Sequence, residues 1–241
     1  MEMRPFFTNK ESSEETTESL PYKEIIGSSV AQRTRPDVSF AVAKLPEYCS
    51  NFAEQHWTSA KRMLRYLKQT KELRITYRPI SEPLTAYTDA DWASCIESRK
   101  SKTGYIVLLS GTPVLWESAK QIVIALSTME AEYIALSECQ TWIKRFLECT
   151  EQGRRIVAGT TKVYCDSQAA IAHANNLVDK TRTKHISIRY HFVREKVEDG
   201  TTEPVYVPSD RNLADILTKP LSQARHKVLK DVLFGLSEVE A

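Results

Sequence analysis

Short strand-like runs alternate with helix-like runs from residue 84 onward, and this order restricts the fold more than any other feature of the sequence. Five runs have the composition of strands, at 84–89, 105–109, 113–116, 162–166 and 204–207. Helical patterns fall between and after them, at about 127–149, 167–175, 185–198 and from 209 onward. The order of three strands, a helix, a strand, helices, a strand and a helix predicts a mixed α/β sheet with helices packed on it.

Local signals set the expected ends of these elements. Ser110-Gly111-Thr112 is typical of a hairpin turn between the second and third strands. Residues 122–126 either extend the third strand or lead into the next helix. That helix is expected to begin at Ser127 and to bury Met129, Tyr133, Leu136, Ile143 and Leu147. Ser209 or Asp210 is expected to cap the last helix of the α/β domain.

The region before residue 84 differs in composition and in hydrophobic pattern. Residues 1–20 are polar and are expected to be a disordered lead-in, and residues 21–80 have helical character. Within them, residues 56–68 form an amphipathic pattern with apolar residues at 57, 60, 64 and 67 and a basic opposite face. We therefore divide the chain into a lead-in (1–20), a helical part (21–80), an α/β domain (84–221) and a C-terminal helix or tail (222–241).

Charge and composition exclude several classes of protein. Lys and Arg number 33 against 31 Asp and Glu, a net charge of +2, which excludes a globally basic nucleic-acid coat and requires any such contact to use local patches. The five cysteines show no Cys-x-x-Cys spacing, which argues against a disulfide framework or a zinc site. With no secretory signal and no membrane-length apolar run, we expect a soluble intracellular protein with no membrane partner.

Four carboxylates share a position at the ends of elements. Asp89 and Asp166 end the first and fourth strands, Glu132 lies one turn into the first long helix, and Asp215 lies in the last helix. Ligands collect at the carboxyl ends of strands in α/β sheets, so the four could converge. Carboxylates at close range repel, and hard divalent cations, Mg²⁺ above all, relieve that repulsion. The alternative is that they are helix caps and solvated acids.

Two further acids compete with this assignment. Glu130 lies three residues after Ser127, the spacing of a capping box, so its carboxylate is expected to turn back to the helix start. This favours Glu132 as the residue that faces the sheet. Asp91, two residues beyond Asp89, is kept as a turn residue or a neighbour of the site.

The same residues carry a resemblance to a known family. Residues 87–93 (Tyr-Thr-Asp-Ala-Asp-Trp-Ala), 127–136, 165–171 (Cys-Asp-Ser-Gln-Ala-Ala-Ile) and 212–221 resemble the ribonuclease H domain of copia-type retrotransposon Pol polyproteins. Blocks at 99–105 and 182–195 match as well, all in the same order. Residues 21–28, 34–38 and 56–70 resemble the end of the same family's reverse transcriptase, so the resemblance covers about residues 21–221.

The resemblance implies a ribonuclease H-like fold, a five-stranded mixed sheet flanked by helices and preceded by a small helical remnant of the reverse transcriptase. It also implies an acidic quartet, Asp89, Glu132, Asp166 and Asp215, that binds two Mg²⁺ ions, with Mn²⁺ as a substitute. The implied activity is hydrolysis of the RNA strand of an RNA/DNA hybrid during reverse transcription. The remainder of a retroelement Pol protein is the other implied partner.

The sequence also departs from the family. No Tyr-x-Asp-Asp motif and no Asp-Asp pair occurs, so DNA synthesis by this chain alone is not expected. The family usually has Ser at the position of Lys102 and Asn at the position of Ser167. Our alternative hypothesis is a non-catalytic fragment of a degenerate Pol protein that binds nucleic acid or serves assembly.

Other residues are candidates for contacts with substrate. His185 and His191 could assist proton transfer or touch substrate, although packing or surface positions are the commoner fate of histidines on such a helix. Basic residues form two clusters that could contact phosphates, Arg99, Lys100 and Lys102 in one and Lys180, Arg182, Lys184 and Arg189 in the other. Each of these side chains could equally be solvated surface.

Overall fold

A five-stranded mixed sheet forms the centre of the protein in the computed structural model, which describes residues 20–27, 31–77, 83–95, 97–149, 159–176 and 187–237. The strands are β1 (Thr85–Asp91), β2 (Lys102–Leu109), β3 (Thr112–Lys120), β4 (Thr161–Cys165) and β5 (Thr202–Tyr206), in the order β3-β2-β1-β4-β5. β1, β2 and β3 pair antiparallel, whereas β4 is parallel to both β1 and β5. The expected mixed α/β sheet is confirmed.

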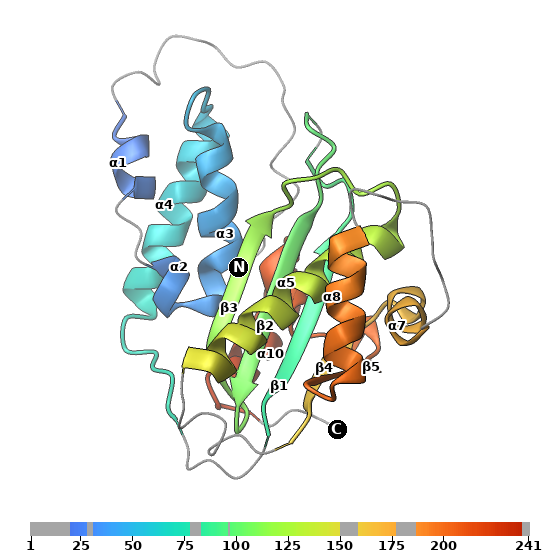
Figure 1. The fold of residues 1–241 in the computed structure, drawn as a ribbon. Helices are drawn as coiled ribbons and strands as arrows, with labels where there is room; N and C mark the ends of the chain where they lie inside the picture. Colours follow the sequence, from blue (N-terminus) through green and yellow to red (C-terminus); the bar gives the residue numbers. More distant parts are fainter. Residues whose placement is uncertain are drawn as a thin grey trace.

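Helices cover both faces of this sheet (Figure 1). One face carries α5 (Thr128–Cys149), α7 (Gln168–Asn175) and α8 (Ser187–Glu198), whose apolar residues pack on Ala86, Val107 and Val163. The other carries η3 (Ser209–Arg211), α9 (Asp215–Thr218) and α10 (Gln223–Leu233). Alternate residues of each strand supply the two cores, because successive side chains in a strand point to opposite faces.

The helical part before residue 84 packs beside β3 (Figure 1). It contains α1 (Tyr22–Gly27), α2 (Ala31–Thr34), η1 (Pro36–Val38), α3 (Ser39–Lys44), η2 (Leu45–Tyr48) and α4 (Glu54–Gln69). Its small core is formed around Tyr22, Leu45 and Met63. Within the described ranges, no helix is both long enough and apolar enough to cross a lipid bilayer.

Several expected element ends are confirmed. Ser110 and Gly111 form the β2–β3 turn with φ of 48° and 75°, the left-handed backbone that such a hairpin uses. Ser127 caps α5, because its hydroxyl accepts the Glu130 amide hydrogen at 3.2 Å. The three middle residues of the predicted buried face, Tyr133, Leu136 and Ile143, are fully buried.

Two expectations about elements are wrong in part. The predicted last helix from residue 209 is broken into η3 and α9, because Asn212 bonds to the sheet, and Pro220 prevents Lys219 from continuing α9. α10 lies within the part expected to be a C-terminal helix or tail. Of the two alternatives for residues 122–126, the structure shows the second, since they do not extend β3 and lead into α5 as an irregular segment in which Ile122 and Leu126 are exposed. In α4, Leu64 is exposed and Met63 is buried instead, so the buried face is rotated from the predicted one.

Candidate metal centre

The first and fourth strands bring two of the predicted carboxylates to one end of the sheet. Thr88 of β1 is in register with Cys165 of β4 in a parallel pair, and Asp89 and Asp166 are the next residues along the chain. Asp166 directly follows β4 as predicted, but β1 continues to Asp91, so the expectation that Asp89 ends the first strand is wrong. The Asp89 side chain is buried, and Asp166 is half-buried. The Ser209 hydroxyl donates to Asp166 Oδ2 at 2.7 Å, which orients this second carboxylate.

Helix α5 adds Glu132 to the same place. Glu132 is 4% exposed, its carboxylate accepts the backbone N–H of Ala90, and both Asp89 and Asp166 act on it electrostatically. A Glu132 oxygen, the Cys165 sulfur and an Asp166 oxygen all lie within 4.8 Å of one another, which is a grouping able to hold a metal ion.

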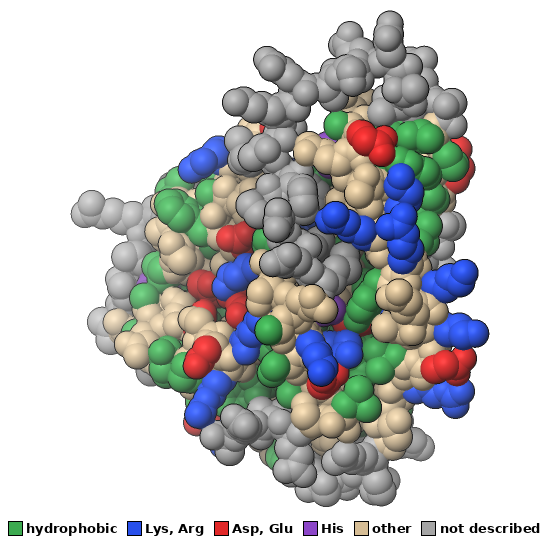
Figure 2. All heavy atoms as spheres, turned by 180° about the vertical axis from the view of Figure 1, so that it is seen from behind, with side chains coloured by type: hydrophobic (Ala, Val, Ile, Leu, Met, Phe, Trp, Pro, Cys, Tyr) green, Lys and Arg blue, Asp and Glu red, His purple; other side chains and the backbone are tan. Residues whose placement is uncertain are grey.

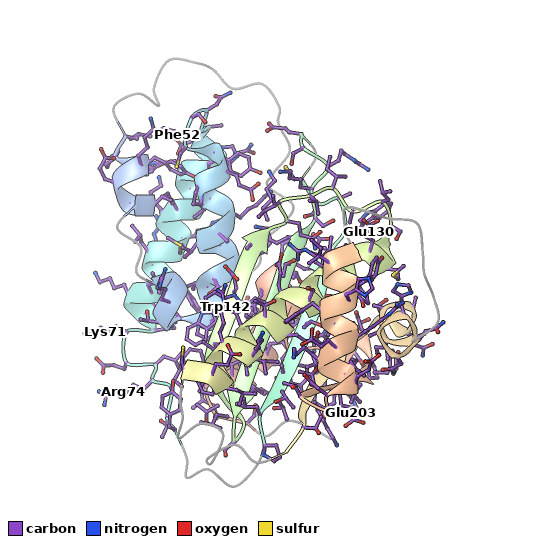
Figure 3. The ribbon with its side chains drawn as sticks, viewed as in Figure 1. Phe52, Lys71, Arg74, Glu130, Trp142 and Glu203 are labelled. Carbon is purple, nitrogen blue, oxygen red and sulfur yellow. The ribbon has the colours of Figure 1, made fainter. Side chains whose placement is uncertain are left out.

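Glu130 caps the start of α5, as predicted. Its Oε2 accepts the backbone N–H of Leu126 at 2.8 Å, while its own N–H donates to Ser127. Figure 3 labels Glu130 at the beginning of α5. The capping bonds account for Glu130, and Glu132 is left as the α5 carboxylate that faces the other acids.

Helix α9 supplies the fourth carboxylate, Asp215, and two local features hold it against the sheet. Asn212 donates to the carbonyl of Thr88 at 2.8 Å, which ties the start of this segment to the residue before Asp89. Gly104, the strand partner of Asp89, lies so close to α9 that an added Cβ would stand 2.6 Å from Thr218 Cγ2. α9 can therefore reach Asp89 only because β2 has glycine at this position.

A lysine joins Asp215 to Asp89. The Lys219 ammonium is 2.9 Å from Asp215 Oδ1 and 3.0 Å from Asp89 Oδ1, and the Thr218 hydroxyl donates to Asp89 Oδ2. Arg225 approaches the other oxygen of Asp215 at 3.5 Å. Asp89 is thus linked through Lys219 to Asp215 and by electrostatic interaction to Glu132, so all four predicted acids belong to one cluster.

Burial and mutual repulsion shift the protonation of these acids. Burial raises the pKa of Asp89 to about 6, against the opposing effects of Lys219 and the Thr218 hydrogen bond. Burial, with Asp89 and Asp166, raises the pKa of Glu132 well above its ordinary value. Although burial alone would lower it, Asp89 and Asp215 raise the pKa of Lys219. The centre is rich in negative charge that Lys219 only partly offsets.

The remaining predicted residues fall around this centre or away from it. Asp91 ends β1, and burial raises its pKa, so it stays a candidate neighbour of the site. His191 is exposed on α8, and Arg189 pairs with Glu138 at 3.0 Å. Four candidates lie outside the described residues, namely Lys180, Arg182, Lys184 and His185.

In the predicted basic cluster before β2, Arg99 is exposed and Lys100 half-buried, but Lys102 differs from the expectation. β2 begins at Lys102, earlier than predicted, and this side chain is 3% exposed and 3.4 Å from Glu47 of the helical part. A buried and paired ammonium is not available to a phosphate, so the prediction for Lys102 is corrected to a packing role.

Three residues of the centre were not predicted from the sequence as part of it: Lys219, Thr218 and Ser209, the last of which was expected only as a helix cap. The spacing of Asp215 and Lys219, four residues apart, is an ion-pair signal on a helix and could have indicated the lysine. No local signal indicates that Thr218 and Ser209 would bond to Asp89 and Asp166, because those contacts span 129 and 43 residues of sequence.

Comparison with known proteins places this chain in a family. The retrovirus-related Pol polyprotein from transposon TNT 1-94 of Nicotiana tabacum is 38% identical over 219 residues, 89% of this chain and 16% of that protein. The one from transposon RE2 of Arabidopsis thaliana is 39% identical over 207 residues, 84% of this chain and 14% of that protein. The chain thus spans about one sixth or less of the length of these relatives. It matches no protein-family model.

Solved structures of ribonucleases H resemble the fold. LC11-RNase H1, isolated from compost, covers 57% of this chain and 94% of its own length at 19% identity, with a TM-score of 0.42. The five-stranded mixed sheet with helices on both faces is the architecture that the sequence resemblance implied. From its similarity to the transposon proteins over most of its length, the chain belongs to the family of retrovirus-related Pol polyproteins from transposons.

Proposed function

We propose that this chain is a metal-dependent endonuclease that hydrolyses the RNA strand of RNA/DNA hybrids within a retrotransposon's reverse transcription machinery. The observation that carries the proposal is the convergence of Asp89, Glu132, Asp166 and Asp215, from four separate elements, at one end of the sheet. The family membership supports the same role.

The donor set fits divalent cations. Asp89, Glu132 and Asp215 are buried, and Glu132 is disfavoured in its charged form by two neighbouring carboxylates. A packed group of carboxylate oxygens with unbalanced negative charge is what hard, oxygen-seeking cations stabilise. Mg²⁺, with Mn²⁺ as a substitute, is the ion that we assign, held by the four acids with two ions in the complete centre.

The residues of the chain have distinct tasks in this proposal. When bound, the two ions would activate a water and stabilise the leaving oxygen of a phosphodiester. Asp89, Glu132, Asp166 and Asp215 would hold the ions, while the hydroxyls of Thr218 and Ser209 fix the orientation of two of these carboxylates.

The candidates for substrate contacts are the basic side chains singled out from the sequence. Arg99 and Lys100, together with Arg189, Lys180, Arg182 and Lys184, are our candidates for phosphate contacts, with His185 and His191 as further candidates near substrate. Recognition would use the shape, phosphates and 2′-hydroxyls of the hybrid rather than its sequence, as is usual for helical RNA.

A cleavage assay tests the proposal. The full chain is incubated with Mg²⁺ and a hybrid labelled on the RNA strand, beside Asp89→Asn and a matched control, Asp199→Asn, which removes a surface carboxylate that pairs with Lys196. We expect cleavage of RNA but not DNA, a loss of about 100-fold or more in Asp89→Asn, and little change in the control. Equal cleavage by all three proteins would sink the enzyme hypothesis and favour a non-catalytic fragment that binds nucleic acid.

A further inference from the structure

Lys219 stands between two of the four acids, and its role is not explained by packing alone. Its ammonium is 3.0 Å from Asp89 Oδ1 and 2.9 Å from Asp215 Oδ1, so one positive charge pairs with one oxygen of each carboxylate. These are also two of the residues to which metal binding is assigned above. An ammonium and a divalent cation cannot both approach the same pair of oxygens, since their charges repel.

The two halves of the centre differ in their counter-charge. Asp89 and Asp215 share Lys219, and Arg225 lies 3.5 Å from the second oxygen of Asp215. Glu132 and Asp166 have no ion pair with Lys or Arg among the described residues. The direct ion pairs therefore lie on the Asp89–Asp215 half, while Lys219 acts on Glu132 only through weaker electrostatic interaction.

The position of Lys219 also allows its side chain to move away from Asp89 and Asp215. It follows the last residue of α9 in extended backbone, with φ of −124° and ψ of 148°, and it precedes Pro220. Its side chain is 35% exposed, so the ammonium has a path to solvent without movement of α9. Lysine carries its charge on a flexible four-carbon stem, which makes such a swing inexpensive compared with a shift of the backbone.

We propose that Lys219 is a built-in counter-ion that makes the binding of two divalent ions sequential and unequal. The first ion binds on the Glu132–Asp166 side, and the second binds only when Lys219 leaves Asp89 or Asp215. In the metal-free protein the same lysine offsets part of the repulsion between the buried Asp89 and Asp215. This inference rests on the proposed function, because it concerns the ions of that same centre.

Titration with Mn²⁺ tests the inference on the full chain without any measurement of cleavage. Isothermal calorimetry compares the wild type with Lys219→Gln, which removes the charge, and Lys219→Arg, which keeps it. Lys144→Gln is the matched control, since Lys144 pairs with Glu148 on α5 about 18 Å along the helix from Glu132. Thermal unfolding in EDTA and in saturating Mn²⁺ provides a second measurement.

We expect two unequal binding steps in the wild type and a second step about tenfold tighter in Lys219→Gln, because the competing charge is gone. Lys219→Gln should unfold at a lower temperature than the wild type in EDTA and gain more from Mn²⁺, whereas Lys219→Arg and Lys144→Gln should follow the wild type. Superposable isotherms for the wild type and Lys219→Gln would overturn this inference but not the proposed function. The same holds if Lys144→Gln changes Mn²⁺ binding as much as Lys219→Gln does. Absence of Mn²⁺ binding in every protein would overturn the proposed function as well.

Discussion

Glu132 carries an electrostatic cost in the metal-free fold. It is nine-tenths or more buried, and Asp89 and Asp166 both oppose its negative charge. Since its pKa in the folded state lies above the value in the unfolded chain, its ionisation favours unfolding. The cost appears as the pH rises above about 4.5, the ordinary value, and grows until the pH passes the raised pKa. A residue retained at such a cost is typical of a functional site.

Replacement of this glutamate should stabilise the metal-free protein while it removes the function. In EDTA at pH 7.5, Glu132→Gln is expected to raise the free energy of unfolding by about 1–2 kcal/mol, because the amide carries no charge to bury. The gain should shrink at pH 5, where wild-type Glu132 takes up a proton more readily. Thermal unfolding at the two pH values measures this, and the cleavage assay should show loss of activity.

Glu130→Ala is the natural comparison for that variant. It removes the carboxylate that accepts the Leu126 amide hydrogen, so we expect a loss of about 1 kcal/mol with metal binding retained. If Glu130→Ala abolished Mn²⁺ binding and Glu132→Gln did not, the assignment of the two glutamates would have to be reversed.

At the scale of elements, the approach of α9 to β2 decides whether Asp215 joins the centre. The contact leaves no room for a side chain at Gly104, where a Cβ would lie 2.8 Å from Leu217 Cβ as well as close to Thr218. The Ser118 hydroxyl of β3 adds a hydrogen bond of 2.6 Å to the carbonyl of Leu217. A helix of four residues has little stability of its own, so these tertiary contacts hold it in place.

Gly104→Ala should therefore disturb the centre without touching any acid. We expect a loss of about 1–3 kcal/mol from overpacking, together with weaker Mn²⁺ binding, because α9 must move and carries Asp215 and Lys219 with it. Chemical denaturation and calorimetry measure the two effects.

Gly111→Ala is the matched control for this substitution. Nothing lies within 4 Å of a Cβ at Gly111, but its φ of 75° makes alanine strained, so stability should fall by about 1 kcal/mol with ion binding unchanged. Equal Mn²⁺ affinity in Gly104→Ala and the wild type would show that α9 does not position the site.

At the scale of the whole molecule, the helical part and the sheet share buried polar contacts. Asp37 accepts from Arg35 and from the Tyr66 hydroxyl at 2.6 Å, and its carbonyl oxygen bonds His226 of α10 at 2.8 Å. Glu47 lies between Lys44, Lys102 and Lys120, two of which belong to the sheet. Figure 2 shows acidic and basic side chains mixed on the face behind the sheet, as the net charge of +2 leads one to expect.

Glu47→Gln should weaken the whole molecule, because it leaves the buried Lys102 without its carboxylate. We expect a loss of about 3 kcal/mol in the free energy of unfolding near pH 7, with most of it restored in the double variant Glu47→Gln/Lys102→Met. Urea denaturation followed by far-ultraviolet circular dichroism and by tryptophan fluorescence measures the loss and shows whether both parts unfold together.

The contribution of Glu47 to stability depends on pH with the opposite sign to that of Glu132. Burial alone would raise the pKa of Glu47, but the lysines Lys44, Lys102 and Lys120 lower it below its ordinary value. The stabilisation by Glu47 is thus complete above about pH 4.5 and is lost as the pH falls through the lowered pKa. The difference between the wild type and Glu47→Gln should disappear in acid, and a difference that persisted unchanged below about pH 3 would contradict this account.

The four acids show how far local patterns reach. In the sequence, Asp89 and Asp166 each close a strand-like run. Glu132 stands near Glu130, whose role a capping box explains. These local signals are sufficient to nominate the three residues. The expected helix from residue 209 is interrupted because Asn212 bonds to Thr88, 124 residues away, and no local pattern predicts that bond. Lys102 was misassigned for a similar reason, since its partner Glu47 is 55 residues distant.

The sequence by itself determined the order of most elements, the mixed α/β class and the four acids, because periodicity and capping act within a few residues. Tertiary structure alone decided which distant groups meet those acids: Lys219 on Asp89, Thr218 on Asp89, and Ser209 on Asp166. These partners depend on distances in space, and chain separations of 43 residues or more leave no trace of them in local pattern.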